Sequence, residues 1–593
     1  MTINKNGLYK LAAVVFAIAT AAVSCIMLDR WLEFNFFYRE QNQLFLFDWQ
    51  DILSKSGSIG GLALVLSMFL VQFFKVPSMG AVLTAAIGLL AAILSWDSVR
   101  KKGALVEVSP LSFLPVILQQ GALSDLMYLY QGYIAFFLAV LFFWIYSRFL
   151  SERGPSCKFL WGTVLSVLLY WIAGPVALLF SVCVLVLEAV SRNRKWFFAF
   201  VPVVAVLACS WISVRLGAIQ EMRMSLLQDY YYEQLLHPGF YIYSSWIALP
   251  LVLLFQILSK GLKGQFARKI LMCLAMVLSL AALLRIPKHI DRKDYDMLRL
   301  NHYENVGDWD SIISDRTSSH RNYLMMNVRN LALSHKGQLL DRLFDFPQSG
   351  IMSLIAQDEH SLQNTDVTIL DSDLYYQMGN VAHSQNMAFD SSVGVRFGCP
   401  PMMMRLIRTN IVMGAYGVAE KYISTMEKTW GYKKEASLMR RFLGDDEAIL
   451  SDPELGRLRR CIIKEDHFVG MDSHRDLELI HEANPEDVAA RDYYLAFMLL
   501  AKDMEGIKEY IETDPKAYDG QGNLNVHLQE AVLVYAEEDE NYCREHGVTE
   551  TVFTRYKAFK KKFLELGANN GDPVTGLKSF SDTFWYYFMF QKI

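Results

Sequence analysis

The sequence lacks the motifs by which most nucleotide-binding, metal-dependent and nucleic-acid-binding proteins are recognised. Its 593 residues contain no HExxH segment, no Walker-type phosphate loop and no GxGxxG before a helix. No run of lysine and arginine exceeds three residues and the formal net charge is -4, so a nucleic-acid partner is not expected. We expect neither a cofactor nor a metal ion.

Cysteine and charge are also sparse. The 8 cysteines are scattered without a CxxC pair, so no disulfide framework is expected. Charged residues make up 20% of the chain, and strand-like alternation of polar and apolar residues is scarce after the last apolar run. These absences point away from a small secreted domain and from a β-sheet protein.

What the sequence has in abundance is apolar runs. Hydrophobic residues make up 53% of the chain, and the excess lies almost entirely before Pro287. A helix needs roughly 20 apolar residues to cross the hydrocarbon core, so several of these runs are short. We predict a membrane domain over residues 1–286 and a soluble domain over 287–593. The predicted crossing helices are Leu11–Leu28, Ser58–Phe74, Ser78–Trp96, Tyr133–Tyr146, Phe159–Ala173, Val176–Val190, Trp196–Val214, Tyr241–Leu258 and Ile270–Leu284.

Basic residues between these runs predict the orientation. With the N-terminus inside, the inner loops contain Lys75, Arg148–Lys158, Arg192–Lys195 and Lys260–Lys269, as the positive-inside rule expects. Arg100-Lys101-Lys102 is the exception, because it falls outside. About nine crossings put the soluble domain in the periplasm of a bacterial inner membrane. This count assumes an uncleaved first helix, although Ala22-Val23-Ser24-Cys25 resembles a lipoprotein cleavage site and makes a signal peptide the alternative.

Three long outer loops collect carboxylates, cations and aromatic rings over the apolar bundle. A carboxylate can take a proton from an attacking hydroxyl, and an arginine can neutralise a phosphate leaving group. These groups suit the handling of a polar head on a lipid tail. The candidates are Glu33, Arg39, Glu40, Gln43, Asp48 and Asp51 in the first loop, Glu107, Asp125 and Tyr128 in the second, and Arg223, Asp229, Glu233 and His237 in the third.

The stretch Glu40-Gln41-Asn42-Gln43-Leu44-Phe45-Leu46-Phe47 resembles the acidic, aromatic-rich first outer loop of polytopic glycosyltransferases of the GT-C fold. That resemblance implies transfer of a sugar from a polyprenyl-phosphate donor, with Glu40 as general base and Asp48 or Asp51 as its catalytic partner or a metal ligand. The chain has Arg39-Glu40 where many such enzymes have an acidic pair. The implied substrate-binding residues are Arg39, Gln43, Asp125, Arg223 and Glu233, with Arg223 or Arg39 on the phosphate.

The same residues have a structural interpretation. Asp48, Asp51 and Lys55 are spaced to form the solvated face of a short amphipathic helix, with Asp51 and Lys55 as an ion pair. The aromatic residues of the first loop and the run 230–232 are typical of an interfacial belt. On this interpretation the protein is a non-enzymatic scaffold. A transporter is disfavoured because the helix interiors hold almost no ionisable residues.

From about Asp291 onward the sequence is typical of successive helices. Leu406 and Ile407 precede Gly414, and Ala419 follows it, a spacing that resembles a tetratricopeptide repeat. Similar turns are predicted at Gly307 and Gly379. Such stacks present a concave surface. We expect this domain either to act as a passive scaffold or to bind an envelope protein.

His467, His474 and His481 raise the question of a metal site in this domain. Their spacing of seven residues corresponds to about 10 Å along a straight helix. Neighbouring histidines at that distance cannot share one zinc ion at about 2 Å each. A turn at Gly470 would be needed to bring them together.

The predicted fold is therefore all-α, a polytopic transmembrane bundle followed by a helical-repeat domain. This order of parts resembles uncharacterised bacterial multi-pass membrane families with helical-repeat tails. Two functions remain open. One is sugar transfer from a polyprenyl-phosphate donor at the outer face. The other is a scaffold that contacts membrane lipids and recruits an envelope protein through its tail.

Overall fold

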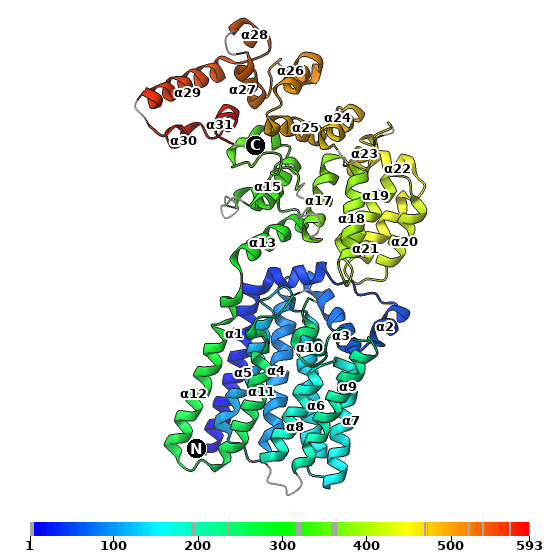
Figure 1. The fold of residues 1–593 in the computed structure, drawn as a ribbon, viewed down its shortest axis with the longest axis vertical. Helices are drawn as coiled ribbons and strands as arrows, with labels where there is room; N and C mark the ends of the chain where they lie inside the picture. The colour runs from blue at the N-terminus through cyan, green and yellow to red at the C-terminus, as the bar shows by residue number, and fades with distance from the viewer. Residues whose placement is uncertain are drawn as a thin grey trace. The chain divides into compact units, whose positions relative to one another are not determined.

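The structure is a computed structural model that describes residues 5–190, 196–233, 236–315, 322–356, 365–465, 467, 470, 472–518, 522–536, 539–568 and 571–591. Within these ranges the secondary structure is helical and no β-strand occurs, which confirms the all-α prediction there. The chain forms two compact units (Figure 1). One is Met1–Tyr295 with Lys428–Gly431, and the other is Asp296–Glu427 with Tyr432–Ile593.

The first unit contains apolar helices suited to a membrane. Six are long and apolar enough to cross one, with spans Gly7–Gln41, Met79–Arg100, Tyr130–Leu150, Trp196–Arg215, Phe240–Gly261 and Gln265–His289. Its helices are α1 (Lys5–Gln41), α2 (Trp49–Ser56), α3 (Gly61–Val71), α4 (Met79–Arg100), α5 (Phe113–Ala122), α6 (Tyr130–Ile145), α7 (Pro155–Ala173), α8 (Val176–Val190), α9 (Phe200–Arg215), α10 (Met222–Leu226), α11 (Phe240–Leu258) and α12 (Gln265–Leu283).

The longer helices of this unit run side by side, so the bundle has two ends (Figure 1). One end, here called the loop end, carries Arg39 at the close of α1, Asp125 and the start of α11. The other, here called the basic end, carries the turn after α4 and the close of α11. Leu105 N–H donates to Ser259 Oγ there at 3.1 Å.

The apolar segment Ser58–Phe74 does not cross the bundle, contrary to the sequence-based prediction. Near its start, the Gly60 carbonyl accepts a hydrogen bond from Gln131 Nε2 at 2.9 Å. At its other end, the Phe74 ring lies 5.1 Å from the ring of Tyr130. Tyr130 and Gln131 are the first two residues of α6, so both ends of the segment lie at the loop end.

A different segment, Val106–Ala122, runs from one end to the other. It consists of a 3₁₀ helix (Val106–Ser112) followed by α5. Leu105 lies at the basic end, whereas the Leu123 carbonyl accepts a hydrogen bond from Arg39 at the loop end at 2.9 Å. Hydropathy does not reveal this crossing because polar residues interrupt it, namely Glu107, Ser109, Ser112, Gln119 and Gln120.

Four buried side chains close a ring of hydrogen bonds inside this unit. Gln119 Nε2 donates to the Tyr128 hydroxyl at 2.6 Å, and that hydroxyl donates to Gln228 Oε1 at 2.7 Å. Gln228 Nε2 donates to Ser245 Oγ, which donates back to Gln119 Oε1. The ring joins α5, α11 and the second and third loops. It therefore satisfies polar groups that apolar surroundings would otherwise leave unpaired.

The second unit is a series of short helices. They are α13 (Arg292–Val306, begun in the first unit), α14 (Trp309–Ser314), α15 (Tyr323–His335), α16 (Leu339–Arg342), α17 (Thr365–Met378), α18 (Val381–Gly394), α19 (Pro400–Val412), α20 (Tyr416–Met426), α21 (Lys433–Met439), α22 (Asp446–Ser451), α23 (Pro453–Arg460), α24 (Ser473–Ala483), α25 (Val488–Ala501), α26 (Met504–Thr513), α27 (Val526–Tyr535), α28 (Glu540–Glu545), α29 (Glu550–Ala568), α30 (Pro573–Gly576) and α31 (Phe584–Phe590).

Helices α17 to α20 pack as successive hairpins at the turns expected from the sequence (Figure 1). Gly379 and Gly414 close these turns with φ angles of 93° and 77°, which favour glycine. Asn380 caps α18 by accepting the His383 N–H at 3.1 Å. Ala419 is fully buried, so α20 approaches its neighbour closely.

Gly132 tests how tightly the hydrogen-bonded ring is enclosed. A Cβ atom at this position would lie 2.2 Å from the Tyr128 hydroxyl, which two ring members hold in place. We expect Gly132→Ala to cost about 1–3 kcal/mol and to lower the thermal unfolding midpoint of the purified protein. Gly261→Ala, which meets nothing within 4 Å, is the control and should leave the midpoint unchanged. Equal midpoints for both variants would contradict a rigid ring.

Candidate functional site

Arg39 joins the first and second predicted loops through its guanidinium group. It is buried in the last turn of α1 and donates to the carbonyls of Leu123 at 2.9 Å, Asp125 at 2.7 Å and Tyr128. An arginine that donates to three fixed carbonyls holds a loop in place. These contacts leave Arg39 poorly placed to contact a phosphate.

Asp125 joins the second and third loops. Its Oδ2 accepts hydrogen bonds from the hydroxyls of Tyr232 at 2.8 Å and Tyr241 at 2.7 Å, and its Oδ1 accepts the Met127 N–H at 3.0 Å. The Glu233 N–H donates to the Met127 carbonyl at 3.0 Å. The three predicted loops thus meet at the loop end, with Asp125 occupied by donors from its own chain.

Arg223 is paired with a carboxylate of its own loop and with a tyrosine of α11. Its Nε lies 2.6 Å from Asp229 Oδ1, and its Nη2 donates to the Tyr243 hydroxyl at 3.1 Å. Tyr243 in turn donates to Asp229 Oδ2 at 2.5 Å. The neighbouring Tyr243 hydroxyl and Asp229 carboxylate raise the pKa of Arg223.

The predicted catalytic carboxylates lie on two helices. Glu40 and Gln43 are buried, at the end of α1 and just after it. Asp48 caps α2 by accepting the Gln50 N–H at 2.9 Å and pairs with Lys428, and these contacts lower its pKa.

Asp51 pairs with Lys55 at 2.6 Å, the contact that their spacing predicts. In the short helix α2 this is an ordinary i,i+4 ion pair between half-buried side chains. Asp51 therefore stabilises α2 through the ion pair that the structural interpretation describes, whereas Asp48 is the N-cap of the helix and not part of its face.

A pocket of about 460 Å³ lies in the second unit, where α15, α17, α23 and the start of α25 meet. Its lining mixes arginine, acidic, amide and hydroxyl groups. The residues are Ser334, His335, Gly337, Gln377, Pro453, Arg457, Arg460, Asn484, Glu486, Asp487, Val488 and Ala489. Most of these side chains are polar or charged, so the pocket is suited to a polar partner rather than to an apolar ligand.

The pocket wall is held by an ion pair. Arg457 Nη1 lies 2.8 Å from Asp487 Oδ2 and also donates to the Gln377 carbonyl at 3.1 Å. Asp487 caps α25 through the Ala489 N–H at 3.0 Å. Arg460 is exposed on the rim of the pocket.

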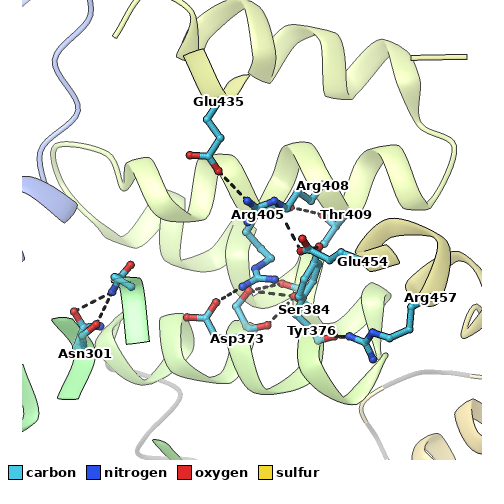
Figure 2. Close-up of polar contacts among 12 residues, drawn as sticks. Asn301, Asp373, Tyr376, Ser384, Arg405, Arg408, Thr409, Glu435, Glu454 and Arg457 are labelled. Carbon is cyan, nitrogen blue, oxygen red and sulfur yellow. Dashed lines mark hydrogen bonds and ion pairs between the residues drawn. The ribbon is translucent and has the colours of Figure 1, made fainter. Parts of the chain in front are cut away.

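Beside the pocket, arginines and carboxylates alternate around one tyrosine ring (Figure 2). The Arg405 guanidinium lies 3.6 Å from the Tyr376 ring centroid and pairs with Asp373. The Tyr376 hydroxyl donates to Glu454 at 2.6 Å, and Arg408 pairs with Glu435 at 2.8 Å. Arg405 and Arg408 are thus each paired with a carboxylate, and the Tyr376 hydroxyl is bound to a third.

His335 adds a neutral group to the lining of the pocket. Its ring stacks on Trp309 with centroids 3.9 Å apart. Burial, with the nearby Arg457 and Arg405 charges, lowers the pKa of His335 to about 4. The imidazole is therefore uncharged near pH 7.

The sequence reasoning missed the pocket residues. The stretch from Asp452 to Arg460 contains a capped helix start and a basic last turn, which was the available signal. Its neighbours in the pocket come from helices more than 100 residues earlier and some 30 residues later in the chain, for example Ser334 and Asp487. Sequence spacing alone does not bring such groups together.

The three histidines contact three different carboxylates. His467 lies 2.5 Å from Asp476, and His481 lies 3.1 Å from Asp514. His474 lies 3.7 Å from a third carboxylate, Asp503. Among the described residues, no group of three or more metal-ligating side chains is suited to hold an ion.

Residues 8–591 match the model of a protein family described as a family of unknown function, DUF6057. The chain belongs to this family. No curated protein matches the chain. No solved structure matches it either. Membership in DUF6057 covers both units and carries no activity with it.

Proposed function

We propose that this protein is a membrane-anchored scaffold whose helical unit binds an envelope protein. The observation that carries the proposal is the pocket between α15, α17, α23 and α25, with Arg457 fixed in its wall and Arg460 exposed at its rim. The successive hairpins α17–α20 beside it suit a tetratricopeptide-like binding surface. At the loop end, by contrast, the polar groups of Arg39, Asp125 and Asp229 are engaged in holding the bundle together.

The partner-binding role predicts specific contacts at the pocket rim. A photoreactive benzoylphenylalanine at Arg460 or at Glu486 should crosslink to one and the same protein in whole cells. Arg457→Gln removes the ion pair with Asp487, so it should lower the crosslink yield about tenfold, equivalent to ~1.4 kcal/mol. Benzoylphenylalanine in place of Lys561 on α29 is the control and should give no adduct. Unrelated adducts at 460 and 486 would contradict a partner site.

For the orientation, we propose that the basic end faces the cytoplasm of a bacterial inner membrane. Among the described residues, this proposal counts nine segments between the two ends, with the stretch 106–122 in place of Ser58–Phe74. In this arrangement Arg100-Lys101-Lys102 joins the other basic turns, including that at Lys260. Arg192–Lys195 lies outside the described residues. The chain leaves the first unit after Tyr295, which contacts the loop end through Phe34, so the second unit is extracytoplasmic.

Reporter fusions distinguish this topology from the one that hydropathy predicts. Alkaline phosphatase fused after Lys102 should be inactive here, because that turn is cytoplasmic. It would be active if Ser58–Phe74 crossed the membrane. Fusions after Tyr295 and after Lys260 should be active and inactive, respectively, and serve as controls. An active fusion at Lys102 would overturn the assignment.

A second candidate function is sugar transfer at the loop end, as the GT-C resemblance implies. The observation that favours it is the meeting of the three predicted loops through Arg39, Asp125 and Tyr232, since the buried Glu40 directly follows Arg39 in the last turn of α1. In this scheme Glu40 is the base that takes a proton from the acceptor hydroxyl. Asp48 and Asp51 would support it from α2, with Gln43 and Glu233 near the substrate.

Replacing Glu40 by Gln separates the two functions. A transferase should lose about 10²–10⁴-fold in glycosyl transfer without its general base, assayed with polyprenyl-phosphate-linked sugar in membranes. A scaffold should retain its partner crosslink at Arg460. Glu152→Gln is the matched control, because it makes the same change at an exposed carboxylate near the basic end, away from the proposed site. Transfer that is unaffected by Glu40→Gln would rule out Glu40 as the base.

A further inference from the structure

The stretch from Phe47 to Phe74 exposes large apolar side chains at the loop end. In the first part, Phe47, Trp49 and Leu53 are 54%, 70% and 51% exposed. In the second part, α3 exposes Leu62, Leu66 and Phe69 along one face while Ala63 and Met68 are buried. Neighbouring exposed apolar side chains of this kind mark a surface that contacts a membrane or another protein.

The two parts form one continuous surface. The ring of Phe45 lies 5.2 Å from Phe47 and 5.5 Å from Phe69, and the rings of Phe47 and Phe69 are 6.4 Å apart. These edge-to-face contacts tie the linker before α2 to α3. The apolar side chains of α2 and α3 therefore act together.

Helix α2 is amphipathic. At about 100° per residue, Trp49, Ile52 and Leu53 share one side of the helix, and the ion-paired Asp51 and Lys55 lie on the other. This is the pattern of a helix that lies in the plane of a membrane interface. Trp49 is also the residue type most typical of that depth.

The geometry of α3 excludes a crossing. Helix α3 and the 3₁₀ turn Gln72–Lys75 together have 15 residues, or roughly 22 Å at 1.5 Å per residue, and both ends of this stretch contact the start of α6. The polar side chains Ser67 and Gln72 are buried. A segment whose two ends both lie at the loop end runs along that end of the bundle.

We propose that residues 45–75 form an interfacial hairpin whose apolar face lies in the lipid leaflet at the loop end, with acyl chains and headgroups of that leaflet as its partner. The exposed row on α3 adjoins the crossing helix α7, whose Leu168 and Trp171 are also exposed, and the Gly60 N–H donates to the Trp171 carbonyl at 2.8 Å. Water and a bound protein are the competing occupants. Continuity with the lipid-facing surface favours lipid over both.

Photocrosslinking in native membranes tests the occupant directly. Benzoylphenylalanine is placed at Trp49, Leu53 or Leu66 of the full-length protein, and adducts are identified by mass spectrometry. Lipid adducts are expected at all three positions. Leu274, exposed on α12, is the positive control, and the exposed Lys293 in α13 is the negative control.

Two results would overturn the proposal. Adducts to a protein at Trp49 and Leu66 would identify a partner surface in place of a lipid one. No lipid adduct at Trp49 and Leu66, with lipid still captured at Leu274, would mean that the hairpin faces water. Since the three positions are separate variants, one that fails to fold leaves the other two to decide.

Discussion

The first unit depends on one constraint, that polar groups within an apolar bundle find their partners inside the chain. Arg39 and the ring around Tyr128 meet this constraint together. The Tyr128 carbonyl accepts from Arg39, and the Tyr128 hydroxyl links Gln119 to Gln228. One residue thus connects α1, α5 and the third loop, and neither the long loops nor α11 can shift without breaking these contacts.

A second charged cluster anchors the basic end in the same way. Lys158 pairs with Glu188, which also accepts a hydrogen bond from the Tyr146 hydroxyl at 3.2 Å, and all three side chains are buried. Tyr146 begins a π-helical turn, Tyr146–Leu150, a widening that interrupts regular α-helical pairing. The i,i+4 spacing predicts that Glu188 pairs with Arg192, which lies outside the described residues; the pair seen is with Lys158, on the neighbouring helix.

The outcome of the sequence predictions follows from what hydropathy measures. Short sequence patterns predicted correctly those features that depend on neighbouring residues. The turns at Gly379 and Gly414 need a positive φ angle, and glycine marks them. Hydropathy measures apolar content and not direction, so Ser58–Phe74 was predicted to cross although it lies along one face. Conversely, hydropathy did not predict that residues 106–122 run from one end to the other. The glutamines of this segment are hydrogen-bonded to residues far away in the chain, such as Ser24 and Ser245.

The same limit applies to the candidate site. The sequence placed Arg39, Asp125 and Glu233 in loops on one face, and those loops do meet. The sequence carried no information on whether these side chains are already hydrogen-bonded to groups of the same chain. Asp125 accepts three hydrogen bonds from its own chain, so its carboxylate is engaged by the protein itself. Arg39 and Asp125 therefore hold the loop end together through contacts within the chain. Within the described residues, the helical unit has a pocket and the loop end has exposed apolar side chains, and these are the surfaces on which the binding and lipid-contact proposals rest.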